Sequence, residues 1–194
     1  MKTLVLALRV GLLTLLATGL AYPLAMTAVA QLLFPEAANG SLARDDAGAV
    51  VGSKLVAQPF TNPWYFQPRP SAAGVKGWDA TASGGSNLGP TSRELLQVAT
   101  QRLARLERDN PDAPRPVPAE LVTASASGLD PHLSPRAALW QVARVARARG
   151  LASDRVRTLV EDLVEPRDWG AFGEPRVNVL LLNLALDHQF GAPP

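Results

Sequence analysis

The stretch VGLLTLLATGLAYPLAMTAVAQLL, residues 10–33, contains no charged side chain and decides the architecture of the chain. At 1.5 Å per residue, a helix of this length covers the ~30 Å hydrocarbon core of a bilayer. Gly19 and Pro23 are compatible with a span, because both residue types are more frequent in membrane helices than in soluble helices. The stretch therefore predicts a transmembrane helix at residues 10–33.

Two other interpretations of this stretch are weaker. A cleaved signal peptide would also begin with Lys2 and Arg9 and could end at the small residues 28–30 (AVA), but secretory apolar regions usually run only about 7–15 residues. A buried core helix of this length normally shows a polar face, and this stretch has none. A retained membrane anchor is the favoured interpretation.

The charges that flank the span predict its orientation. Lys2 and Arg9 precede the span, and the first charge after it is Glu36. The positive-inside rule then leaves residues 1–9 in the cytoplasm and places residues 35–194 outside as one extracytoplasmic soluble domain.

The remaining residues predict one small α+β domain with a loop-rich first half and a helical second half. About 160 residues suffice for one small core, and 15 glycines with 17 prolines among 194 residues indicate many loops. The irregular part lies between Asn39 and Thr91, with short strands expected at 49–51 and 54–56.

Four helices are expected in the second half. Thr91 and Glu94 form a capping-box pair that opens a helix to about Arg108. Ser134 as N-cap and Pro135 at the first helical position open a second helix, which ends at Gly150. A third begins at Ser153 and ends before Pro166, and residues 177–190 form an apolar, buried fourth helix.

The helix after Ser134 has two contrasting faces. At 100° per residue, one face is apolar and carries Leu139, Val142, Ala143 and Ala146. The opposite face carries Arg136, Trp140, Arg144 and Arg147. This second face could dock a partner's carboxylates or anionic lipid head groups, but a solvated basic face is the favoured interpretation.

The residue inventory excludes several functions. Two histidines and no cysteine cannot build a His/Cys metal cluster, so no metal ligand is assigned. A net charge of +2 without clustered Lys and Arg argues against a nucleic-acid partner.

No GxxxxGK[ST] phosphate loop occurs in the sequence. The glycine-rich residues 83–87 (SGGSN) could present backbone N–H groups to an anion, although a plain turn is the favoured interpretation.

Residues 123–132 hold the residue types of a catalytic triad. Ser125 and Ser127 precede Asp130 and His132 in this short stretch. A triad is normally assembled from segments that are separate in sequence, and no G-x-S-x-G elbow is present. Turns and caps that lead into the Ser134 helix are the favoured interpretation, and no catalytic residue is assigned.

Several phrases in order behind one span resemble the C chain of the Kdp potassium-transporting ATPase. They are NGSL 39–42, VGS 51–53, QPF 58–60, YF 65–66, RPSA 69–72, SGGSNL 83–88, VP 117–118, LVTAS 121–125, SGLD 127–130, VNV 177–179 and LNLALD 182–187. Together they cover essentially the whole chain. One departure is Gln67-Pro68, where a glycine is expected before Arg69.

The resemblance implies a subunit rather than an enzyme. In the family's complex, a potassium-channel-like subunit carries the ion and a P-type subunit hydrolyses ATP, so ATP and potassium are used by the complex and neither is assigned to this chain. No Asp-Lys pair occurs here, as a phosphorylated P-type aspartate would require. The expected location is the bacterial inner membrane, among lipid and these two subunits.

The resemblance also implies a role as a catalytic chaperone, since the family's C chain has been viewed as raising the affinity of the hydrolytic subunit for ATP. Candidates for nucleotide or partner contact are Ser83, Gly84, Gly85, Ser86, Asn87, Ser127, Gly128 and Asp130. Candidates for a partner interface are Tyr65, Arg69, Arg136, Trp140, Arg144 and Arg147.

An external domain conflicts with direct contact to cytoplasmic ATP. The alternative role is a cap that stabilises the channel-like subunit or shapes its ion entrance. Two further hypotheses are an anchored binding module that acts alone and an anchored hydrolase that uses Ser125 or Ser127 with His132.

Overall fold

The computed structural model describes residues 1–45 and 47–192. The chain divides into two compact units, one up to Leu42 and one from Ala43 onward. We call them the N-terminal unit and the C-terminal unit. Together they give a mixed architecture of helices and small sheets behind one apolar helix.

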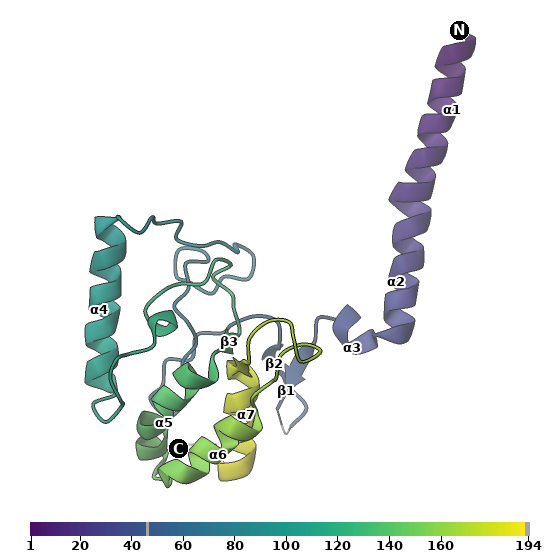
Figure 1. Ribbon diagram of the computed structural model, residues 1–194. Helices are drawn as coiled ribbons and strands as arrows, with labels where there is room; N and C mark the ends of the chain where they lie inside the picture. Colours follow the sequence, from purple (N-terminus) through teal and green to yellow (C-terminus); the bar gives the residue numbers. More distant parts are fainter. Residues whose placement is uncertain (46, 193–194) are drawn as a thin grey trace. The chain divides into compact units, whose positions relative to one another are not determined.

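The N-terminal unit is a continuous helix from Lys2 to Leu33 (Figure 1). It consists of α1 (Lys2–Leu16), the π-helical turn η1 (Ala17–Ala21) and α2 (Tyr22–Leu33). In the described part of the chain, this helix alone is long and apolar enough to cross a membrane. Its 32 residues reach about 48 Å, which exceeds the hydrocarbon core, and the helix extends beyond the predicted span to Lys2.

Proline explains both irregularities of this unit. Pro23 has no N–H to donate to Gly19, and the helix widens just before it, where the Tyr22 N–H bonds to the Ala17 carbonyl, five residues back. Phe34 leaves the helical conformation because it precedes Pro35. The short helix α3 (Pro35–Ala38) follows.

Within the described residues, the chain forms two small sheets. Strand β1 (Leu42–Arg44) pairs with β2 (Val50–Ser53). Strand β3 (His132–Leu133) pairs antiparallel with β4 (Val177–Asn178), with His132 opposite Asn178. The strand expected at 54–56 is wrong, because the chain turns there and the Leu55 amide donates to Ser53 Oγ at 3.1 Å.

The helices of the C-terminal unit largely agree with the capping signals. They are α4 (Arg93–Asp109), the 3₁₀ turn η2 (Ala119–Leu121), α5 (Pro135–Arg149), α6 (Ser153–Asp162) and α7 (Val179–Phe190). Ser134 Oγ accepts a hydrogen bond from the Ala137 amide, and Gly150 ends α5 with a left-handed φ of 66°, as predicted.

Two helix starts differ from the expected ones. The capping box at Thr91 is wrong by one residue, because Ser92 is extended and its Oγ accepts from the Leu95 amide. The fourth helix begins at Val179, since Val177 and Asn178 pair with β3. The Asn178 side chain then caps α7 by accepting from the Leu181 amide.

The hydrophobic core lies among α5, α6 and α7, where α6 packs against both neighbours. Its fully buried apolar side chains include Phe66, Leu133, Val145, Val156, Val160, Val177, Leu182 and Leu186. Helix α4 stands apart from these three helices in Figure 1 and contains no buried residue, although Leu106 packs against the core.

The segment 63–67 passes through this core without being part of a sheet. Side-chain amides take the place of a neighbouring strand. Asn183 Oδ1 accepts from the Phe66 amide and Asn183 Nδ2 donates to the Phe66 carbonyl, both at 2.9 Å. Gln141 makes the same pair of bonds with the backbone of Gln67, at 2.9 and 3.0 Å. Phe66 is thereby fixed in the core with its backbone polar groups satisfied.

Arg144 completes the attachment of this segment. Its Nη1 donates to the carbonyls of Pro63 and Tyr65, at 2.5 and 3.0 Å. Its Nη2 donates to Gln141 Oε1 at 2.6 Å, and its Nε donates to Asn110 Oδ1 at 2.9 Å. Burial lowers the pKa of Arg144 to about 10, so the guanidinium stays charged at neutral pH.

Replacing Asn183 by alanine tests this attachment. The change leaves the Phe66 N–H and C=O buried without partners, so we expect the free energy of unfolding of the C-terminal unit to fall by about 3 kcal/mol. Urea denaturation of the full chain in detergent measures the change. Gln189→Ala, on the exposed side of the same helix, is the control and should alter stability by less than about 0.5 kcal/mol. Equal losses for the two variants would contradict the assignment.

Candidate functional site

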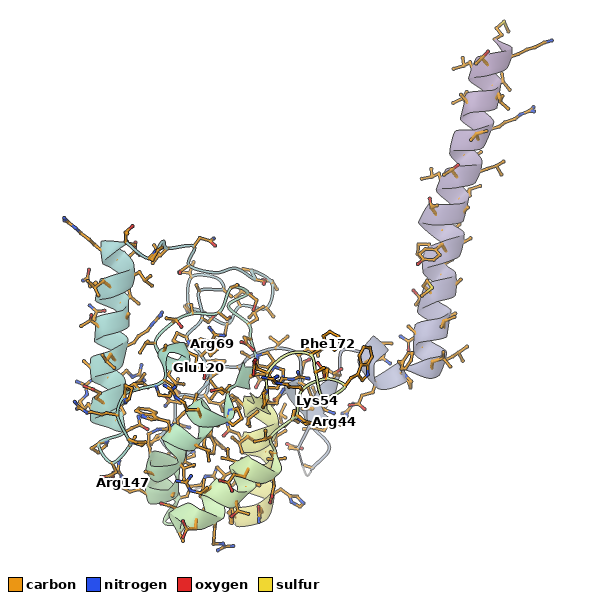
Figure 2. All side chains as sticks on the ribbon, in the orientation of Figure 1. Arg44, Lys54, Arg69, Glu120, Arg147 and Phe172 are labelled. Atoms are coloured by element: carbon orange, nitrogen blue, oxygen red, sulfur yellow. The ribbon has the colours of Figure 1, made fainter. Side chains whose placement is uncertain are left out.

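The basic face predicted on α5 is largely enclosed. Trp140 and Arg144 are 5% and 4% exposed, so the expectation of a solvated face is wrong for both. The Trp140 Nε1 donates to the Pro114 carbonyl at 2.7 Å, because the proline-rich segment covers this side of α5. Both side chains therefore lie inside the C-terminal unit rather than on its surface. Arg136 and Arg147 are exposed, and Arg147, labelled in Figure 2, forms an ion pair with Asp112.

The structure brings together the two segments that were predicted to contact nucleotide or partner. The Ser83 hydroxyl and the Gly84 amide both donate to the Ser127 carbonyl, at 3.0 and 2.8 Å. Gly85 lies against the neighbouring backbone, since a Cβ on Gly85 would be 2.8 Å from the Ala126 carbonyl oxygen. Ser86 and Asn87 are exposed beside this contact.

Ser71 adds a third segment at Gly128. The Ser71 hydroxyl donates to the Gly128 carbonyl at 2.5 Å and accepts from the Trp78 amide at 2.7 Å. Gly128 has a φ of 67°, and a Cβ there would be 2.6 Å from the Gly84 carbonyl oxygen and 2.7 Å from the Ala73 nitrogen. Only glycine fits this position, for both conformational and steric reasons.

Asp130 contacts both Arg69 and His132, by an ion pair with Arg69 and a hydrogen bond from the His132 backbone. Its Oδ2 lies 3.0 Å from Arg69 Nη1, and its Oδ1 accepts from the His132 amide at 3.0 Å, with His132 Nδ1 at 3.7 Å. Burial alone would raise the pKa of Asp130, but the hydrogen bonds from His132 and Arg69 and the Arg69 charge hold that pKa below its usual value. The carboxylate is therefore ionised at neutral pH.

The serines near Asp130 make turn contacts. Ser127 Oγ accepts from the Leu129 amide at 3.1 Å and lies 3.5 Å from Ser125 Oγ. Within residues 1–45 and 47–192, no hydrogen bond joins His132 to either serine, so a nucleophile and base are not paired. Nor do these residues contain a group of three or more His, Asp or Glu side chains that could hold a metal ion.

Tyr65 belongs to a second polar cluster, built from three segments. The Tyr65 hydroxyl donates to Asp187 Oδ2 at 2.6 Å, and Arg149 Nη2 lies 2.6 Å from Asp187 Oδ1. The Arg149 guanidinium also lies 5.1 Å from the centre of the Tyr65 ring. Burial, and then the hydrogen bond to Asp187, raise the pKa of Tyr65 above its usual value. Arg149 and Asp187 were not predicted, because no spacing in the sequence relates residues 65, 149 and 187.

This second cluster borders an open groove of about 1040 Å³. Its lining is mostly apolar and includes Leu180, Leu181 and Leu184 of α7, together with polar residues such as Arg44 and His188. A mostly apolar surface that also carries polar residues is compatible with a protein–protein interface.

Replacing Gly128 by alanine tests the contact of the three segments. We expect a loss of about 3 kcal/mol or more in unfolding free energy, because the Cβ overlaps backbone atoms that cannot move independently. Gly150→Ala is a matched control, since Gly150 has nearly the same φ of 66° but open space around its Cβ position. That control should cost only about 1 kcal/mol, and equal costs measured by urea denaturation would show that the overlap is unimportant.

Comparison with known proteins gives one consistent family. The family model described as "K+-transporting ATPase, c chain" matches residues 4–188. The potassium-transporting ATPase KdpC subunit of Myxococcus xanthus is 62% identical over 193 residues, covering 100% of this chain and 91% of the relative. The subunits of the same name from Rhodospirillum rubrum and Sorangium cellulosum are 57% and 55% identical, covering 92% and 88% of this chain and 91% and 89% of the relatives. This chain belongs to the c-chain family of the K+-transporting ATPase.

Proposed function

We propose that this chain is a non-catalytic accessory subunit of an ATP-driven potassium pump, and that its C-terminal unit caps the channel-like subunit outside the cytoplasm. Family membership supports the role in the pump. The observation that carries the external position is the charge distribution around the helix Lys2–Leu33. Lys2 and Arg9 lie at its N-terminal end, and the first charge after it is the acidic Glu36.

Direct contact with ATP is not part of this proposal. An external unit does not meet cytoplasmic nucleotide. The glycine-rich turn is also poorly suited to phosphate, because the Gly84 amide and the Ser83 hydroxyl already donate to Ser127. Any effect of this chain on ATP binding by the hydrolytic subunit would then be transmitted through the complex.

The groove along α7 is the surface that we propose for contact with the channel-like subunit. Its mostly apolar lining with several polar residues suits a protein partner, and Tyr65 is part of that lining. The Tyr65–Asp187–Arg149 cluster fixes these side chains before binding, which lowers the ordering cost of association. The remaining candidates, Arg69, Arg136 and Arg147, lie outside this lining and stay predictions.

Cysteine labelling tests the orientation, because the natural chain contains no cysteine. Val75→Cys places a thiol at a fully exposed position of the C-terminal unit, and Thr3→Cys places one near the N-terminus. In intact bacterial spheroplasts, a membrane-impermeant maleimide should label the Val75→Cys variant readily and the Thr3→Cys variant only after permeabilisation. The reverse pattern would place the unit in the cytoplasm and restore nucleotide contact as a possibility.

Co-purification tests the role in the pump. An affinity-tagged chain, extracted in mild detergent, should bring with it a channel-like subunit and a P-type subunit that together show potassium-stimulated ATPase activity. Membranes from a strain that lacks this chain should lose most of that activity, and expression of the full chain should restore it. If the chain purifies alone and no ATPase depends on it, a separate external binding module becomes the better explanation.

A further inference from the structure

Two backbone bridges hold the loop between α6 and β4 in one conformation. Glu165 and Arg176 form an antiparallel bridge at its base, and Asp168 and Phe172 form a second bridge nearer its tip. The Asp168 carbonyl accepts from the Phe172 amide at 3.0 Å and from the Ala171 amide at 3.2 Å. The loop therefore presents its tip in a defined conformation.

The tip of this loop, residues 169–173 (WGAFG), is uncharged and exposes two aromatic rings. Trp169 is 94% exposed and Phe172, labelled in Figure 2, is 63% exposed. The two rings pack edge to face, with centroids 6.0 Å apart. The other three tryptophans, Trp64, Trp78 and Trp140, are partly or fully buried. We call residues 169–173 the aromatic tip.

The backbone at Trp169 is unusual for so large a side chain. Its φ of 52° lies in the left-handed region, which glycine adopts without strain and bulky residues rarely adopt. A strained conformation that persists at an exposed position points to a use for the side chain. Within the C-terminal unit, the Trp169 ring has Phe172 as its aromatic neighbour and is otherwise open to solvent.

The charges below the tip are paired with one another. Arg167 lies 2.8 Å from Glu174, and Arg176 lies 2.9 Å from Glu165 and 3.3 Å from Asp168. The tip itself offers no charge to a partner. Exposed aromatic side chains next to paired charges suit the interface of a bilayer, between the head groups and the acyl chains. There the apolar part of a tryptophan ring contacts lipid, and its N–H can donate to water.

The chain keeps this unit close to a bilayer. Nine residues, 34–42, connect the end of the apolar helix to the start of the C-terminal unit, and their maximum reach is about 30 Å. A lipid surface therefore lies within a short distance of the C-terminal unit, on whichever side of the membrane the unit lies. We propose that the aromatic tip inserts into the lipid interface as a second membrane contact of this chain.

This inference rests on the anchor in the proposed function but not on its orientation or on the pump subunits. Spin labelling of Ala171→Cys, in the otherwise cysteine-free full chain, tests it in vesicles of phosphatidylethanolamine and phosphatidylglycerol. Collisions with oxygen report lipid, and collisions with a water-soluble nickel chelate report water. We expect the ratio of oxygen to chelate collision rates to be several-fold higher at residue 171 than at a label on Val75→Cys.

Variants of the tip provide the controls. Trp169→Glu in the Ala171→Cys background should return the ratio to the aqueous value, while Trp169→Phe should keep it high, because only the first places a charge at the tip. Both variants should retain the unfolding midpoint of the parent within error, since the side chain is exposed.

Two results would overturn the inference. A label at residue 171 that is as accessible to the chelate as the label at residue 75 would show that the tip stays in water. In the reconstituted pump complex, a label that is immobile and shielded from both reagents would show that a partner subunit covers the tip. The measurement on the chain alone in vesicles does not require the pump, so failure of the pump assignment would be recognised separately.

Discussion

The hydrogen bonds of the Arg144 guanidinium are the interactions on which the C-terminal unit depends most. A buried charge is tolerated only when its hydrogen-bonding groups are satisfied. Here two backbone carbonyls and the side-chain amide oxygens of Asn110 and Gln141 accept hydrogen bonds from it. One side chain thereby connects the end of α4, the segment 63–67 and helix α5. An apolar residue at this position could fill the space but could not hold these three parts together.

The position of both polar clusters follows from this constraint. Because the backbone of 63–67 is held by Arg144, Gln141 and Asn183, Tyr65 is placed where its hydroxyl reaches Asp187. The chain continues from this segment to Arg69 and Ser71, which reach Asp130 and Gly128. Contacts between side chains and backbone thus take the place of the larger sheet found in other domains, which is consistent with strands of only two to four residues.

The sequence was most informative where a signal is local. The uncharged run at 10–33 predicted an apolar helix, and Ser134, Pro135 and Gly150 predicted both ends of α5, because caps depend on a few adjacent residues. The burial of Trp140 and Arg144 on α5 could not be predicted in this way. Periodicity shows which side chains share a face, but burial of Trp140 and Arg144 depends on segments 26 to 81 residues away. Gly128 was chosen for its motif, whereas the reason for glycine there is the approach of Gly84 and Ala73.

If the helix Lys2–Leu33 spans the membrane, as proposed, the short connector limits the distance of the C-terminal unit from the bilayer but does not fix its orientation. A unit that must dock on a neighbouring subunit loses this freedom on binding, and the loss opposes association. A second contact with the lipid, at the aromatic tip, would remove part of that freedom beforehand and raise the effective concentration of the groove at its partner. A rigid contact of this kind is favoured by the two backbone bridges of the loop, by the paired charges at its base and by the strained backbone of Trp169. The physical advantage would be orientation, since the proposed anchor would already supply membrane affinity.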